Sequence, residues 1–166
     1  VTSGASKKGP LAFYDAADAP SSGASGDGNS IITEMAQKKY PHKVLSSIVD
    51  PTAVSKAHEL GVGASFKIGI GGSLDPRFVP LEMDWTVKSI GNDINLKMET
   101  WKFLLNPGPT AVLESGNFTV VAMTHSVMMC DRTIYFANGC DPRDFHSTIV
   151  KSPHCEPQFY DDWIEQ

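Results

Sequence analysis

A glycine-rich loop that leads into a predicted helix is the feature of this sequence best suited to binding chemistry. Ser21–Asn29 contains Gly23, Gly26 and Gly28, and Ile31–Lys39 follows with the apolar periodicity of a helix. Glycine allows positive φ and close approach of the backbone to a ligand, and the free N–H groups of a helix N-terminus favour an anion. The loop therefore predicts a site for a peptide carboxylate or a phosphate, although its spacing matches neither a P-loop nor a dinucleotide fingerprint. An ordinary surface loop that closes a strand–helix connection is the alternative.

Carboxylates flank this loop on the side of the preceding predicted strand. Asp15 and Asp18 follow apolar residues, and Asp27 lies within the loop itself. Because ligands prefer the carboxyl ends of strands in an α/β sheet, the three side chains could line a cleft, and together with carbonyl oxygens they could hold a hard cation. Aspartates at such positions also cap turns and helices through bonds to backbone N–H groups, which is the competing interpretation.

A second polar group follows the last predicted strand, where Lys151, Ser152 and His154 stand close together. The lysine and the serine could reach an anionic substrate group near the glycine-rich loop; alternatively, Ser152 only caps the strand end. No residue is assigned a catalytic role. The candidate substrate-binding residues are therefore Asp15, Asp18, Gly23, Gly26, Asp27, Gly28, Asn29, Lys151, Ser152 and His154.

The spacing of histidine and cysteine does not predict a metal site within this chain. The five histidines are dispersed without an H-x-H or H-x-x-x-H pair, and Cys130, Cys140 and Cys155 show no C-x-x-C spacing. An odd number of irregularly spaced cysteines also argues against a disulfide framework and favours a reducing, cytoplasmic setting.

Composition bounds the class of protein. The chain has 166 residues, 41% of them hydrophobic and 20% charged, with a net charge of −5, which fits one soluble globular domain. The negative charge gives no basic footprint for nucleic acid, and no apolar run is long enough for a membrane span or a signal peptide. Val1–Pro10 is small and polar and predicts a linker or frayed end, with the domain itself over residues 11–166.

Apolar periodicity and turn residues predict an α/β fold in which strands and helices alternate at first and antiparallel strands follow. The expected fold is a mixed sheet with an N-terminal βαβαβ part and an antiparallel meander, with helices packed on the sheet. The predicted elements of the first part are a buried strand at Leu11–Ala17, a helix at Ile31–Lys39 capped by Asn29 or Ser30, a strand at Val44–Val49, a helix from Asp50 to Gly61 and a strand at Ala64–Ile70. The predicted elements of the second part are a strand at Val79–Val87, a turn at Gly91–Asp93, a return strand through Ile94, Leu96 and Met98, a hairpin of Thr110–Leu113 with Phe118–Thr124, a helix at Asp131–Asn138, a strand at Thr148–Lys151 and a helix at Gln158–Glu165.

Three sequence blocks, in order along the chain, carry a resemblance to a known family. They are YDAADAPSSGASGDGNSII at the first loop, GPTAVLESGNFTVVAMT at the second hairpin and GCDPRDFHSTIVKSPH at the last strand. Together they resemble the C-terminal region of the MlrC (microcystinase C) family of metallopeptidases. The first block departs from the family's Asn-Pro-Gly-Gly-Gly, since the chain has Ala19–Gly23 in the order Ala-Pro-Ser-Ser-Gly there.

The resemblance implies a domain of a zinc-dependent peptidase or amidohydrolase that acts on a peptide or amide substrate and contributes to the substrate cleft. It places the zinc ligands in an N-terminal domain outside this chain, so the parent is expected to be an enzyme and the fragment to hold no metal and to be inactive alone. It also implies a truncated C-terminus, the missing N-terminal domain as a partner, and contacts that could form a homo-oligomer. The alternative function is a non-catalytic binding or regulatory module that holds an anionic small molecule at the glycine-rich loop.

Overall fold

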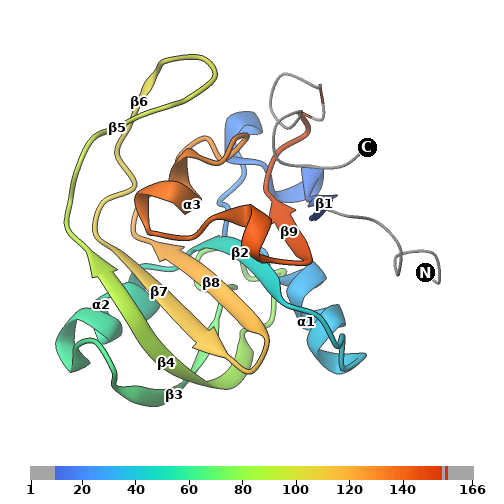
Figure 1. Ribbon diagram of the computed structural model, residues 1–166, viewed down its shortest axis with the longest axis vertical. Helices are drawn as coiled ribbons and strands as arrows, with labels where there is room; N and C mark the ends of the chain where they lie inside the picture. Colours follow the sequence, from blue (N-terminus) through green and yellow to red (C-terminus); the bar gives the residue numbers. More distant parts are fainter. Residues whose placement is uncertain (1–9, 155, 157–166) are drawn as a thin grey trace.

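A seven-stranded mixed sheet forms the centre of the computed structural model, which describes residues 10–154 and 156 (Figure 1). Its strand order is β1-β9-β2-β8-β7-β4-β3; the first four strands run parallel and the other three join by antiparallel pairing. Two short strands, β5 and β6, form a separate ribbon that projects from the sheet. The strands are β1 (Leu11–Tyr14), β2 (Val44–Val49), β3 (Ser65–Ile70), β4 (Leu81–Gly91), β5 (Leu96–Lys97), β6 (Leu104–Leu105), β7 (Thr110–Ser115), β8 (Phe118–Met123) and β9 (Ser147–Val150).

Helices cover both faces of the sheet. α1 (Ser30–Gln37) and α2 (Pro51–Leu60) pack on one face, and α3 (Thr133–Ala137) packs on the other. α2 begins where Asp50 Oδ1 accepts a hydrogen bond from the backbone N–H of Ala53 at 2.9 Å. Among the described residues, no helix combines the length and apolarity needed to cross a bilayer. Short 3-10 helices lie in the connections, at Ala16–Asp18, Pro20–Ser22 and Pro142–Asp144.

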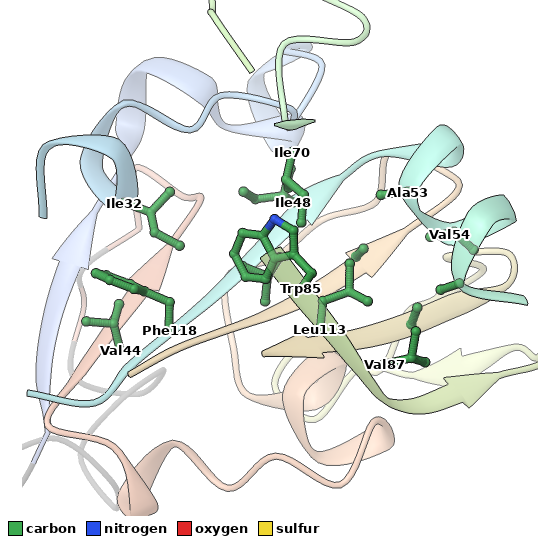
Figure 2. Packing of buried hydrophobic residues seen from close by; sticks show 14 of the residues in the cluster. Ile32, Val44, Ile48, Ala53, Val54, Ile70, Trp85, Val87, Leu113 and Phe118 are labelled. Atoms are coloured by element: carbon green, nitrogen blue, oxygen red, sulfur yellow. The ribbon is translucent and has the colours of Figure 1, made fainter. Parts of the chain in front are cut away.

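The alternation of side chains along β2 divides the core between the two faces. Val44 and Ile48 pack in the cluster that includes α1 and α2, whereas Leu45 and Val49 pack in the cluster that includes α3. Figure 2 shows the first of these clusters, where the fully buried indole of Trp85 lies beside Ile48. Because helices cover both faces, all six residues of β2 are buried. Burying each large apolar side chain contributes roughly 1.5–3 kcal/mol, so β2 stabilises the core on both faces of the sheet.

The predicted α/β class is confirmed, and several elements lie where the sequence places them. The strand Val44–Val49, the helix that follows Asp50 and the hairpin now seen as β7 and β8 are all present. The first strand ends at Tyr14 rather than at Ala17 and is only partly buried, because it is an edge strand that pairs with β9 alone. The helix predicted at Gln158–Glu165 lies outside the described residues, as does nearly all of the predicted N-terminal linker.

The predicted antiparallel meander is wrong in one pairing. The chain after β4 does not return along β4; Leu96 enters the β5–β6 ribbon, and β4 pairs with β7 instead. β3, expected as the third strand of a βαβαβ unit, lies at the far edge of the sheet and pairs antiparallel with β4. Alternating polar and apolar residues identify a strand but do not specify its partner, which depends on contacts distant in sequence.

Candidate functional site

The parallel strands end side by side and carry charged residues at that edge. The last residues of β1 and β9 are paired, so Asp15 and Lys151, which follow them, leave the sheet at the same level. Asp50 follows the neighbouring strand β2. The carboxyl ends of parallel strands are the usual ligand-binding edge of an α/β sheet. Here Asp15, Asp18, Lys151 and the loop Ser25–Asn29 form what we call the carboxyl-edge cluster.

The carboxylate of Asp18 lies at the centre of the carboxyl-edge cluster and is only 2% exposed. Its Oδ1 accepts a hydrogen bond from Gly26 N at 2.9 Å, and its Oδ2 accepts one from Gly28 N at 2.6 Å. The glycine-rich loop therefore binds an anion, but that anion is a side chain of the same polypeptide. An external carboxylate or phosphate would have to displace Asp18 to reach these two N–H groups.

Lys151 supplies the positive charge of the cluster from a side chain that is 1% exposed. Its Nζ donates to Asp18 Oδ2 at 2.8 Å, to Asp15 Oδ2 at 3.2 Å and to the carbonyl oxygen of Gly28 at 2.5 Å. These three acceptors match the three protons of an ammonium group. A buried charge is tolerated when it is paired and fully hydrogen-bonded, and here the pairing joins β9 to β1 and to the loop.

Asp27 and Asn29 attach the loop to the connection between β3 and β4. Asp27 is fully buried, and its Oδ2 accepts hydrogen bonds from Leu74 N at 2.7 Å and Asp75 N at 2.9 Å. Asn29 Nδ2 donates to the carbonyl oxygen of Ile70 at 2.8 Å. Asn29 is the N-cap residue of α1, which is one of the two positions predicted, but its side chain makes no capping hydrogen bond. Both side chains use their polar atoms to hold the fold together.

Two glycines of the loop are required by space as well as by backbone conformation. Gly26 has a φ of 81°, and a Cβ there would lie 2.9 Å from carbon atoms of two neighbouring side chains. A Cβ at Gly28 would lie 2.7 Å from Asp18 Oδ2. At Gly23 a Cβ would meet nothing within 4 Å, and the reason for glycine there is its φ of 85°. The stretch Gly26–Asn29 is buried, so the alternative of an ordinary surface loop does not describe the second half of the loop.

Ser152 and His154, which follow Lys151, contact one another and the segment that contains β5 and β6. Ser152 is fully buried, and its Oγ accepts a hydrogen bond from His154 N at 3.0 Å, which agrees with the capping alternative. The His154 ring packs edge-on against Trp101 of the ribbon segment, with ring centroids 5.0 Å apart. Of the sequence-predicted site residues, the structure thus joins Asp15, Asp18, Gly26, Gly28 and Lys151 in one network, while Asp27 and Asn29 bind the chain between β3 and β4.

The carboxylates of the cluster do not gather as a metal site. Asp15 and Asp18 both contact the Lys151 ammonium, while Asp27 accepts backbone N–H groups. Within residues 10–154 and 156, no three His, Cys, Asp or Glu side chains are placed to hold a metal ion. The described residues therefore do not fit the zinc that the family resemblance implies.

A cavity of about 570 Å³ lies at the amino ends of the parallel strands β2 and β8. This cavity was not predicted from the sequence. Polar groups line it, among them Lys43, Glu114, Asn117 and Cys140. Burial raises the pKa of the Cys140 thiol from 9.0 to about 11, so this thiol stays protonated at neutral pH and is a poor nucleophile. The lining residues come from several separate segments, and no local pattern links them.

Sequence reasoning also missed a second role of Asp50. Besides capping α2, it accepts a hydrogen bond on Oδ2 from Gly71 N at 2.9 Å, which ties β2 to the end of β3. The Asp-Pro pair in the sequence indicates the cap, but it carries no signal for a contact 21 residues away.

Comparisons with known proteins agree with this fold. A family model described as MlrC C-terminus matches residues 13–163. Microcystinase C from Sphingomonas sp is 26% identical over 144 residues, which are 86% of this chain and 28% of that protein. A solved protein from Mesorhizobium sp. BNC1, provisionally described as a metallopeptidase, has the same fold, with a TM-score of 0.87 and 23% identity over 98% of this chain and 33% of that one. The chain therefore spans about a third or less of the length of these relatives.

Proposed function

The chain belongs to the MlrC C-terminus family, and we propose that it is the C-terminal domain of a longer metallohydrolase of the peptidase or amidohydrolase type. The observation that carries this proposal is a nearly complete match of the chain to a small part of its relatives. They match 86% and 98% of this chain, while the chain covers 28% and 33% of them. The name microcystinase C and the provisional description of the solved relative as a metallopeptidase support hydrolysis as the reaction of the parent.

In this proposal the chain forms one wall of the substrate cleft and does not supply the metal. Because the described residues do not fit zinc, we assign no hydrolytic step to them and place the metal and its ligands in the remainder of the parent protein. The contribution of this chain is a fixed carboxyl edge, where the Lys151–Asp18 pair holds two strands and the glycine-rich loop together.

Asp15 is the residue of the carboxyl-edge cluster best placed to meet a substrate. Its side chain is 14% exposed, whereas those of Asp18 and Lys151 are almost fully buried. The Lys151 ammonium, 3.2 Å from Asp15 Oδ2, fixes this carboxylate at the edge of the sheet. An ionised carboxylate only accepts hydrogen bonds, so Asp15 would bind an amide N–H or an amine of the substrate.

Zinc analysis and peptide hydrolysis, measured on the full-length parent beside the 166-residue chain, test the domain assignment. We expect the parent to hold about one zinc ion per chain and to cleave peptides or amides, and the isolated domain to do neither. Stoichiometric, tightly bound zinc in the isolated domain would overturn the proposal, and so would a parent that hydrolyses no peptide or amide.

The substitution Asp15→Asn in the full-length parent tests the role of that carboxylate. We expect KM to rise roughly 2- to 10-fold with little change in kcat, since one substrate hydrogen bond is lost away from the hydrolytic centre. Asp84→Asn, at an exposed position of β4, is the matched control and should change neither constant. An unchanged KM in Asp15→Asn would remove Asp15 from the substrate site but would leave the domain assignment intact.

The second candidate function, a non-catalytic module that binds an anionic small molecule at the glycine-rich loop, is less well supported. Asp18 already accepts the hydrogen bonds of Gly26 N and Gly28 N, so a ligand anion would need to replace it. Titration of the chain with phosphate and with sulfate distinguishes the two functions: shifts of the amide resonances of Gly26 and Gly28 would favour the binding module.

A further inference from the structure

The segment between β4 and β7, which contains the β5–β6 ribbon, exposes large apolar side chains beside the carboxyl edge of the sheet. We call residues 92–109, which contain this ribbon, the arm; it projects at the top of the molecule in Figure 1. Ile94, Phe103 and Leu104 of the arm are 52%, 57% and 72% exposed. The ring of Trp101 lies next to that of Phe103, with centroids 6.1 Å apart. A group of large apolar side chains exposed on one short ribbon is typical of a surface that meets a partner.

Polar contacts fix the tip of the arm to the start of α3. The guanidinium of Arg132 donates two hydrogen bonds to the Glu99 carboxylate, at 2.7 and 2.8 Å. Thr100 donates to Asp131 Oδ2 from its hydroxyl at 2.6 Å and from its backbone N–H at 3.0 Å. Because the arm is ordered by these bonds before it meets a partner, little conformational entropy would be lost on docking.

The buried side of the arm packs next to the carboxyl-edge cluster. Met98 and Leu105 of the arm pack in one buried group with Cys130 and Val150. Val150 is the last residue of β9 and directly precedes Lys151. Met98 and Leu105 of the arm are therefore part of the domain core at the edge proposed to face the substrate, whereas Ile94, Phe103 and Leu104, whose exposed side we call the outer side of the arm, are open to solvent.

We propose that the outer side of the arm is the surface on which the remainder of the parent polypeptide docks in the full-length protein. This rests on the proposed function in one respect, that the chain is a domain of a longer protein. Two thirds or more of each relative lies outside the match, and a model of a C-terminus places that part before the matched residues. If this chain and the remainder of the parent share a cleft at the carboxyl edge, they meet beside the arm, whose exposed aromatic and aliphatic side chains can bind the remainder.

Photo-cross-linking from the arm in the full-length protein identifies what covers it. The substitution Phe103→p-benzoylphenylalanine places the photoreactive group at the exposed apolar surface, and mass spectrometry of the digested product locates its partner. We expect cross-links within one chain to residues that precede Val1. Val62→p-benzoylphenylalanine is the control, because Val62 is 62% exposed in the connection between α2 and β3 and should give no such product.

Cross-links only between two copies of the protein would overturn the proposal, and so would the absence of any cross-link from position 103 or an equal yield from both positions. As a second measurement, adding Leu104→Glu should lower the yield from position 103 about fivefold or more, because an apolar anchor is lost. Adding Val62→Glu should leave that yield unchanged. These readouts do not depend on hydrolysis, so their failure is distinguishable from failure of the proposed enzymatic function.

Discussion

Replacing Lys151 with methionine should destabilise the domain strongly, because Lys151 is one half of a buried ion pair. The side chains of Lys151 and Asp18 are 1% and 2% exposed, and their charged atoms lie 2.8 Å apart. Methionine keeps most of the aliphatic volume but leaves the Asp18 carboxylate without its cation and the carbonyl of Gly28 without its donor. Removing one partner of a buried pair costs about 3–5 kcal/mol, because the remaining charge stays buried.

The remaining contacts of Asp18 place the expected loss at the lower end of that range. In the variant, Asp18 keeps the hydrogen bonds from Gly26 N and Gly28 N, which still stabilise its negative charge. We therefore expect the free energy of unfolding to fall by about 3 kcal/mol. In a domain of this size, 1 kcal/mol corresponds to about 2–4 °C in the melting temperature, so Tm should fall by about 6–12 °C.

Urea denaturation of the 166-residue chain, followed by tryptophan fluorescence, measures the loss. Lys38→Met is the matched control, since Lys38, the C-cap residue of α1, pairs with Glu34 at 3.0 Å and both side chains are well exposed. Such exposed pairs contribute only about 0.3–0.5 kcal/mol. Equal losses in Lys151→Met and Lys38→Met would refute the reasoning. The double variant Lys151→Met with Asp18→Asn should recover part of the loss, because the almost fully buried charge of Asp18 is removed together with its partner and only the partly exposed Asp15 loses its cation.

Three further predictions concern the core, the loop and the thiols. Trp85→Ala should cost about 3–5 kcal/mol because the indole is fully buried. Trp85→Phe should cost clearly less, since Trp85 Nε1 has no hydrogen-bond partner among the described residues; circular dichroism in urea compares the two, and equal losses would contradict this. Gly26→Val should cost roughly 1–3 kcal/mol, because a side chain there combines a φ of 81° with a 2.9 Å contact; an unchanged Tm would show that the loop relaxes without cost. Burial raises the pKa of the Cys130 thiol from 9.0 to about 12 and that of Cys140 to about 11, so the thiols ionise in the unfolded chain before they do in the folded one. The free energy of unfolding should therefore fall as pH rises above about 9. Alkylation of Cys130 and Cys140 at about pH 8 should be much slower in the folded protein than in urea, and equal alkylation rates at these two thiols would refute the expectation.

Elements and the one hairpin defined by local signals could be predicted, but the pairing of strands distant in sequence could not. Asp50 followed by Pro51 marks the start of α2, and Gly61 marks its end, because capping depends only on neighbouring residues. Beyond β4, the apolar alternation continues through Ile94 and Leu96 and predicts a return strand that does not form. The chain leaves the sheet at that point because the arm packs on the carboxyl edge, a contact between segments far apart in sequence.

The chemistry of the glycine-rich loop was predictable, but the identity of its anion was not. Gly26 N and Gly28 N do bind a carboxylate, as glycine conformation and free N–H groups suggest. That carboxylate belongs to Asp18, only eight and ten residues earlier, and the pattern of residues cannot distinguish an internal partner from a ligand. The pairing of Asp18 with Lys151 spans 133 residues, so it emerges only from the parallel arrangement of β1 and β9.

The residues of the carboxyl-edge cluster differ in burial, so we expect their substitution to change different quantities, either the stability of the domain or the KM of the parent enzyme. Asp18 and Lys151 are almost fully buried and bind one another and the backbone, so their substitution should change stability first. Asp15 is partly exposed at the same edge, so its substitution should change KM first. An Asp18→Asn parent that kept its stability but bound substrate less tightly would reverse this division. It would mean that the N–H groups of Gly26 and Gly28 exchange Asp18 for a ligand during turnover, and the glycine-rich loop would then be the substrate site.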